Sequence, residues 1–155
     1  MGLNLNFKYK GFDFVAYTFA SVGNDMVRNY ERTLTDVNRL NYVLDRWTGE
    51  GTSNSVPRVT NGATTNTVFS DFYVEDASFI RIQNVQLGYT LPVNWTDKFN
   101  ISKVRVYGRV DNLYTFTKYR GFDPSASNGA PIGGGIDSGF YPVPRTYSVG
   151  LNLNF

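Results

Sequence analysis

Residues 146–155 read TYSVGLNLNF, and from Tyr147 onward apolar side chains alternate with polar residues or glycine. Successive side chains of a β-strand point to opposite faces of a sheet, so this pattern predicts a strand with one apolar and one polar face. The apolar positions are Tyr147, Val149, Leu151, Leu153 and Phe155.

The hexapeptide GLNLNF occurs twice, at residues 2–7 and 150–155. Two copies indicate two strands in equivalent environments, although they do not make a repeat protein. Between them, period-2 alternation and glycine-containing turns predict three more strands. We expect the five strands at about residues 2–10, 12–22, 79–91, 103–116 and 145–155.

The connections between these strands alternate in length. Lys10-Gly11 and residues 92–102 are short connections, whereas residues 23–78 and 117–144 are long. Outer-membrane barrels pair short periplasmic turns with long extracellular loops, and a tilted strand of ~9–11 residues crosses the bilayer. We therefore expect an all-β chain whose antiparallel up-and-down strands form about five strands of a large transmembrane β-barrel, with both long loops outside the cell.

The first long loop shows a second periodicity. Apolar residues recur there at three- and four-residue spacing, which predicts one amphipathic helix or two short ones. Thr35-Asp36 is suited to cap the second helix. The apolar positions of this pattern are Met26, Val27, Tyr30, Leu34, Val37, Leu40, Leu44 and Trp47.

The composition excludes several functions. The chain carries 15 basic and 13 acidic residues, and a net charge of +2 gives no reason to expect a nucleic-acid partner. It contains neither histidine nor cysteine, so a Ser-His-Asp triad and a thiolate metal site are impossible. We therefore expect no enzyme, no cofactor and no metal. No apolar run reaches the length of a transmembrane helix.

The expected barrel is incomplete. Five strands cannot close a wide barrel, and open edges in lipid would leave backbone groups unpaired. An envelope protein also needs an export signal, and residues 1–8 hold no apolar core of that length. We therefore expect a fragment, with Met1 as an internal start or a cut point.

Four segments together resemble the C-terminal barrel strands and loops of SusC/RagA-type TonB-dependent transporters. They are DRWTGEGTSNSVPR (45–58), ASFIRIQNVQLGYTLP (77–92), VRVYGRVDNLYTFTKYRGFDP (104–124) and GFYPVPRTYSVGLNLNF (139–155). The resemblance implies the C-terminal part of a multi-pass barrel of about 22 strands in the cell outer membrane, with a plugged lumen. The family's N-terminal plug and TonB-contacting segment have no counterpart in this chain.

The resemblance also implies a function and partners. It implies a wall segment of an active importer of oligosaccharides or peptides, driven by the TonB system. A SusD-like surface lipoprotein, outer-membrane lipid and the outer-membrane assembly machinery would be its partners. Two other functions stay open: a passive porin or structural barrel, and a soluble carbohydrate-binding β-sandwich.

Three groups of residues are candidates for functional roles. Phe155 resembles the terminal aromatic signal for barrel assembly, or is an ordinary interface aromatic. Arginines and an aspartate on the polar strand faces would line the lumen, either along a substrate path or as a network bracing the wall or plug, because a charge on the lipid face costs ~2–4 kcal/mol. Aromatic residues of the two long loops would contact the sugar rings of a substrate, pack the loops or contact a partner. The lumen candidates are Arg81, Arg105, Arg109 and Asp111, and the loop candidates are Trp47, Tyr119, Phe122 and Tyr141.

Overall fold

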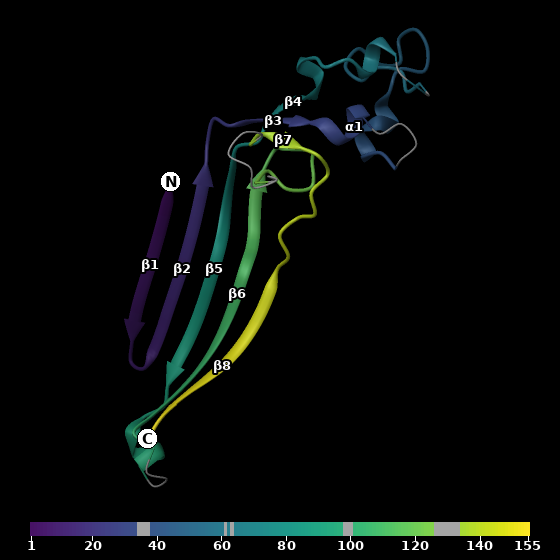
Figure 1. Cartoon of the computed structure of the whole chain (residues 1–155). Helices are drawn as coiled ribbons and strands as arrows, with labels where there is room; N and C mark the ends of the chain where they lie inside the picture. The colour runs from purple at the N-terminus through teal and green to yellow at the C-terminus, as the bar shows by residue number, and fades with distance from the viewer. Residues whose placement is uncertain (34–37, 61, 63, 98–100, 126–133) are drawn as a thin grey trace. The chain divides into compact units, whose positions relative to one another are not determined.

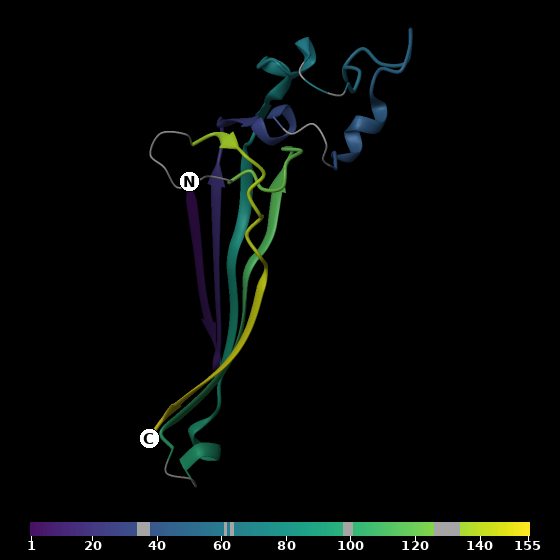
Figure 2. The same ribbon diagram turned by 45° about the vertical axis from the view of Figure 1, so that its right-hand side comes forward.

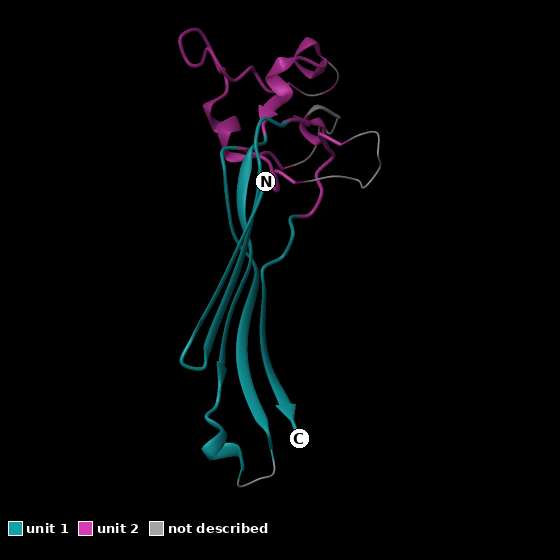
Figure 3. Cartoon of the chain, turned by 90° about the vertical axis from the view of Figure 1, so that its left-hand side faces the viewer, with its two compact units in different colours: residues 1–24, 77–118, 142–155 teal, residues 25–76, 119–141 magenta. Residues whose placement is uncertain are grey.

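The computed structural model of the chain describes residues 1–33, 38–60, 62, 64–97, 101–125 and 134–155. These residues fall into two units, coloured separately in Figure 3. Unit 1 comprises residues 1–24, 77–118 and 142–155, and unit 2 comprises residues 25–76 and 119–141. The two long connections expected from the sequence thus contribute the whole of unit 2.

Unit 1 is built on one antiparallel five-stranded sheet with the order β1-β2-β5-β6-β8 (Figure 1). Each strand pairs with the strands before and after it along this unit, which is an up-and-down arrangement. The sheet confirms the fold class expected from the alternating segments. Its strands are β1 (Gly2–Tyr9), β2 (Phe12–Ser21), β5 (Phe79–Thr90), β6 (Lys103–Thr117) and β8 (Thr146–Asn154), each ending within one residue of the expected bounds.

The two short connections of unit 1 have different structures. Lys10 and Gly11 both adopt positive φ, 43° and 86°. Positive φ at both central residues matches the twist of the flanking strands, so this two-residue turn suits a hairpin. The connection from β5 to β6 contains a short helix, α2 (Val93–Thr96).

One face of this sheet is apolar and open. The register aligns Tyr9, Phe12 and Tyr89 across three strands, and Val106 and Leu151 continue the same row. Leu151 keeps 57% of its surface exposed and Val149 keeps 86%. Figure 2 shows the sheet as a single curved layer, and the described residues of unit 1 form no second layer on this face. The sheet therefore leaves an exposed apolar wall.

A β-bulge determines which face of the sheet the side chains of residues 79–82 in β5 occupy. Strict alternation would place Arg81 on the apolar face with Val85 and Leu87. One extra residue of β5 lies between Ile82 and Asn84 relative to β2, and β6 compensates around Asn112, whose φ is 53°. The extra residue reverses the parity of β5, as bulges do. Arg81 therefore shares the polar face, where its Nε donates to Thr115 Oγ1 at 2.8 Å.

Unit 2 contains a small second sheet that the sequence pattern did not predict. Its order is β4-β3-β7, with β4 antiparallel and β7 parallel to the central strand β3. Met26 of β3 and Tyr73 and Tyr119 nearby in the unit are its buried apolar side chains. The elements of unit 2 are β3 (Asp25–Arg28), α1 (Asn29–Thr33), η1 (Asn41–Asp45), η2 (Thr65–Thr67), η3 (Asp71–Tyr73), β4 (Val74–Asp76) and β7 (Ile136–Asp137).

The expected helix of the first long loop is partly wrong. A short helical element is present, as α1 and the 3-10 turn η1, but Met26 and Val27 belong to β3. Their backbones pair with Glu75 and Val74 of β4, so hydrogen bonds to a distant segment override the local periodicity. The expected cap Thr35-Asp36 lies outside the described residues. Among the helices that the structure describes, none is long and apolar enough to cross a membrane.

Candidate functional site

The polar face of unit 1 carries a row of side chains across all five strands. In this row Lys8 pairs with Asp13, Asp13 with Gly88, Gly88 with Tyr107, and Tyr107 with Gly150. The ring of Tyr107 covers Gly150, where an added Cβ would collide with it. An aromatic ring lying over a strand glycine replaces the packing that the glycine lacks.

Arg105 reaches across this row to Asp13, two strands away. Its Nε donates to Asp13 Oδ1 at 2.8 Å, and its Nη2 makes a second bond to Asp13 Oδ2. The guanidinium also lies 4.9 Å from the centre of the Tyr107 ring. Two parallel hydrogen bonds between an arginine and a carboxylate hold both side chains in one orientation, in addition to the attraction between their charges. The pair passes over Gly88, where an added Cβ would lie 2.5 Å from Arg105 Nη2 and 2.6 Å from Asp13 Oδ1.

Gly88→Ala is therefore expected to displace this ion pair and to destabilise the sheet by about 1–3 kcal/mol, the usual cost of overpacking. Thermal unfolding of the purified full-length receptor measures the change. Gly108→Ala is the matched control, because nothing lies within 4 Å of the added Cβ on that strand glycine. Equal losses of stability in the two variants would show that the space above Gly88 is not needed for the pair.

The other expected lumen residues form two further groups on the polar face. Arg109 donates to Asp111 Oδ1 through Nε at 3.0 Å and Nη2 at 2.7 Å. Asn84 Nδ2 donates to the same carboxylate oxygen at 2.8 Å. Arg81 lies apart from these three residues, 5.2 Å from the ring of Phe79. All four candidates are thus on the polar face, and their contact with a substrate stays a prediction.

The loop aromatics lie in unit 2 and differ widely in exposure. Tyr141 is 90% exposed and Trp47 is 36% exposed. Phe122 is half-exposed and stacks on Tyr30, with 5.9 Å between ring centres. Tyr119 is buried, and its hydroxyl donates to Asp137 Oδ2 at 2.8 Å. Substrate contact by Tyr119 would require this packing to open, whereas the other three rings are accessible.

Asp137 closes a turn as well as accepting the Tyr119 hydrogen bond. Its Oδ1 accepts the backbone N–H of Gly139 at 2.8 Å and that of Phe140 at 3.3 Å. Burial, together with the hydrogen bond to Asp137, raises the pKa of Tyr119. The phenol therefore stays protonated at neutral pH and remains a donor to this buried carboxylate.

A buried ionic cluster at Arg28 connects the segments of unit 2. The Arg28 side chain is fully buried, and it pairs with Glu31 and, through Nε at 2.9 Å, with Glu75. It also donates to the Tyr42 hydroxyl at 2.8 Å and to the carbonyl oxygen of Phe72 at 3.1 Å. A buried charge persists only when it is paired and hydrogen-bonded, so these contacts are structural.

Glu75 and Tyr42 extend the Arg28 cluster to the surface. Arg120 donates to Glu75 through its backbone N–H at 3.1 Å and its Nε at 2.6 Å. Its guanidinium lies 4.8 Å from the centre of the Tyr42 ring. Burial raises the pKa of Tyr42, so its hydroxyl stays protonated and donates to Glu31 at 2.7 Å.

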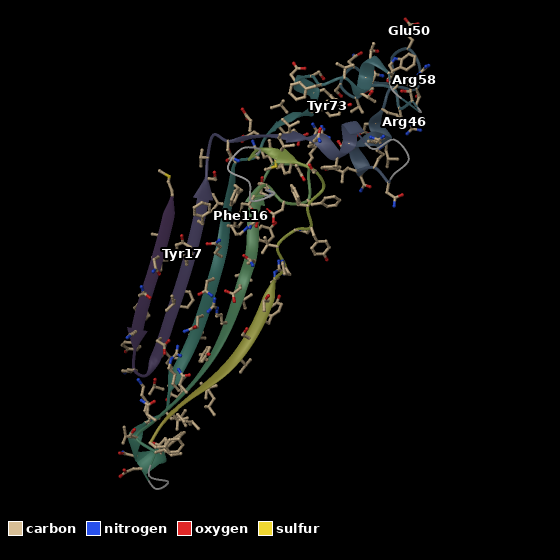
Figure 4. All side chains as sticks on the ribbon, in the orientation of Figure 1. Tyr17, Arg46, Glu50, Arg58, Tyr73 and Phe116 are labelled. Carbon is tan, nitrogen blue, oxygen red and sulfur yellow. The ribbon has the colours of Figure 1, made fainter. Side chains whose placement is uncertain are left out.

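A hollow of about 420 Å³ lies beside Trp47 in unit 2. Arg58 lines it, with the guanidinium carbon 6.0 Å from the centre of the Trp47 ring. We call it the Trp47 hollow. Figure 4 labels Arg58 with Arg46 and Glu50 of the same loop. The residues that line the Trp47 hollow are Trp47, Ser53, Asn54, Ser55, Val56, Pro57, Arg58, Thr65, Asn66, Ser70 and Phe72.

Sequence reasoning missed several charged residues of these sites, among them Asp13, Arg28 and Arg58. Asp13 follows the Lys10-Gly11 turn on a polar strand position, and strand parity alone indicates its face. Arg28 lies in the segment that was expected to be helical, so nothing local indicated its burial. Arg58 belongs to the Pro-Arg of a motif carrying the family resemblance, which was the one available signal.

Phe155 follows the last residue of β8 and is 88% exposed. Its role in barrel assembly stays a prediction. Within the described ranges, no group of three or more acidic side chains is placed to hold a metal ion.

Comparisons with known proteins place this arrangement in a family. No family model matches the chain. The TonB-dependent receptor P3 of Formosa agariphila is 34% identical over 166 residues, covering 100% of this chain and 16% of the relative. The TonB-dependent receptor SusC of Bacteroides thetaiotaomicron is 30% identical and covers 100% of this chain. The chain belongs to the SusC/RagA-type TonB-dependent receptors.

Solved structures agree with this SusC/RagA-type assignment. The RagAB peptide importer in its open-open state matches 99% of the chain with a TM-score of 0.75 and 30% identity. Its closed-closed state matches with a TM-score of 0.76 and 31% identity. The five-stranded sheet corresponds to the C-terminal part of such a TonB-dependent barrel.

This SusC/RagA-type chain spans a small share of its relatives. It covers 16% of the P3 receptor, 15% of SusC and 17% of the RagAB chain. These relatives are named as receptors and importers, not as enzymes.

Proposed function

We propose that this chain forms part of the wall of an outer-membrane, TonB-dependent importer of nutrients. The observation that carries the proposal is the two-faced sheet of unit 1, with one exposed apolar face and one face of charged and amide side chains. In this role the chain is no enzyme and needs no cofactor. It contacts outer-membrane lipid directly.

The apolar face has the properties of a lipid contact. Leu5, Leu87 and Leu151 are each more than half exposed, on three different strands. A water-soluble protein rarely leaves such a continuous apolar surface uncovered. Transmembrane barrels instead alternate apolar-out and polar-in along every strand, as this sheet does.

The polar face suits the lumen of the same barrel. Two ion pairs lie on it, one between Arg105 and Asp13 and one between Arg109 and Asp111. Paired charges brace a wall that meets water or a plug. The long connections, which form unit 2, then lie on the extracellular side.

The relatives support import as the activity, and they are compatible with two classes of substrate, peptides and oligosaccharides. RagAB is described as a peptide importer, and SusC is a TonB-dependent receptor. We therefore propose peptides or oligosaccharides as cargo of the complete receptor. Its partners are the TonB system, a SusD-like surface lipoprotein and the outer-membrane assembly machinery, which would recognise Phe155.

Uptake experiments test the proposal. Cells expressing the full-length receptor are given a mixed pool of oligosaccharides and peptides, and mass spectrometry follows depletion of each compound from the medium. We expect some compounds of one class to be depleted only when both the receptor and TonB are present. Depletion that needs the receptor but persists without TonB would instead identify a passive porin.

A further inference from the structure

We infer that the Trp47 hollow binds a carboxylate group of the cargo, with Arg58 as the residue that pairs with it. The Arg28 cluster is not the candidate for this role, because its charges pair with one another, and Arg105 and Arg109 of unit 1 have ion pairs of their own. The inference rests on the proposed import function and names the chemistry that the loop recognises.

Arg58 is the main reason to expect an anion. Within the part of the chain that the structure describes, its guanidinium has no carboxylate at ion-pair distance. Its neighbour is the Trp47 ring, whose electron-rich face attracts and orients a cation. A planar guanidinium held in this way presents free donors in the geometry that matches a carboxylate.

The rest of the hollow suits a polar ligand with a flat face. Ser53, Ser55 and Thr65 bring hydroxyl groups, Asn54 and Asn66 bring amides, and Trp47 and Phe72 bring aromatic surface. No acidic residue is among the described residues that line the hollow. A volume of about 420 Å³ is within the usual range of small-ligand sites, which combine aromatic walls with a few polar groups.

The loop that bears these residues is braced by its own hydrogen bonds. The backbone N–H of Trp47 donates to the carbonyl of Val56 at 2.9 Å, which ties the two sides of the loop together. Asn66 Nδ2 donates to the carbonyl of Arg58 at 3.2 Å, and the Tyr73 hydroxyl donates to the carbonyl of Asn66 at 2.5 Å. Bracing of this kind lowers the entropy cost of binding.

Two classes of cargo bring a carboxylate to this site. One is an oligosaccharide containing uronic acid, whose ring also has a C–H face to lie on the aromatic surface. The other is a peptide with a C-terminal or side-chain carboxylate. The probes are therefore trigalacturonate with its methyl ester, and an aspartate-containing tetrapeptide with its fully amidated form. Each pair differs in charge but keeps the same framework.

The test measures binding of these probes to the purified full-length receptor by calorimetry. For one acidic probe, Arg58→Gln is expected to weaken binding by about 10- to 100-fold, the usual effect of losing a charge-assisted hydrogen bond. Binding of the matching neutral probe should be unchanged. Trp47→Ala should weaken binding of both forms by about two- to tenfold, because it removes the aromatic wall as well as the cation–π contact.

Arg46→Gln is the matched control, since Arg46 is in the same loop but does not line the hollow. It should leave both affinities unchanged. The inference is overturned if Arg58→Gln binds all acidic probes as tightly as the wild type, or if it weakens acidic and neutral probes equally. Heat-modifiable migration on gels verifies that each variant is folded.

The result also separates this inference from the proposed function. A receptor that imports in a TonB-dependent manner but shows no charge-dependent loss with Arg58→Gln refutes the carboxylate site and leaves the import function intact. A TonB-independent uptake overturns the import function, whatever Arg58 binds.

Discussion

Replacing Val149 by Arg in the full-length receptor is expected to remove most of the folded protein from the outer membrane, and Leu151→Arg should do the same. Val149 is 86% exposed on the apolar face of β8, and Leu151 lies two residues further along it. A lipid-facing arginine at the bilayer midplane costs ~2–4 kcal/mol. The folded fraction, measured as heat-modifiable receptor in the membrane fraction, reports the loss.

Ser148→Arg and Asn152→Arg are the matched controls on the same strand. Ser148 lies opposite Arg109 and Asn152 opposite Arg105, so each new arginine meets an existing one. Such like-charge neighbours cost only about 0.2–1 kcal/mol on a face that meets water, and Asp111 and Asp13 partly offset it. The controls should therefore assemble nearly normally. Equal losses at all four positions would contradict the assigned faces and the lipid contact with them.

Replacing Arg28 by Met should destabilise unit 2 by about 3–5 kcal/mol, the usual result of removing one partner from a buried ion pair. Arg28 is fully buried, while Glu31 and Glu75 are 3% and 10% exposed. Without the guanidinium, Glu31 retains the Tyr42 hydroxyl as donor, but its negative charge is left unpaired. The cost arises from this uncompensated charge more than from the lost contacts.

Hydrogen exchange of the full-length receptor measures this change locally. Protection of the amides of β3 and β4 should fall by about 150- to 5,000-fold, the equivalent of 3–5 kcal/mol if these amides exchange through opening of the unit. The double variant Arg28→Met with Glu31→Gln should recover part of it, because no unpaired charge then remains at Glu31.

Arg120→Met supplies the comparison for the Arg28 variant. Arg120 pairs with the same Glu75 but is 46% exposed, and an exposed ion pair contributes only about 0–1 kcal/mol. If Arg28→Met and Arg120→Met lower the protection of β3 equally, burial of Arg28 has no special effect on stability.

The predicted resemblance and the five-stranded antiparallel sheet were both confirmed. In a strand with alternating apolar and polar side chains, such as residues 147–155, the strand's own sequence predicts which side chains share a face. The Lys10-Gly11 turn and the long polar connections then delimit the strands. These are local properties, and they were sufficient to predict that Arg105, Arg109 and Asp111 lie on the polar face.

Other features depended on contacts between distant segments. Arg81 shares the polar face only because β5 is bulged, and the bulge appears only in the register of β5 with β2 and β6. Met26 and Val27 have helical spacing but pair with β4. Neither outcome follows from periodicity, because periodicity describes one segment at a time.

By itself the sequence determined the sheet, its two faces and the family, since alternation along a strand and linked motifs are written in consecutive residues. Only the tertiary structure decided that Arg28 is buried among partners from β4, η1 and η3, and that Arg58 has no carboxylate within reach in the described chain. Burial and pairing of a charge depend on which remote groups come within a few ångströms of it, and no local pattern records that.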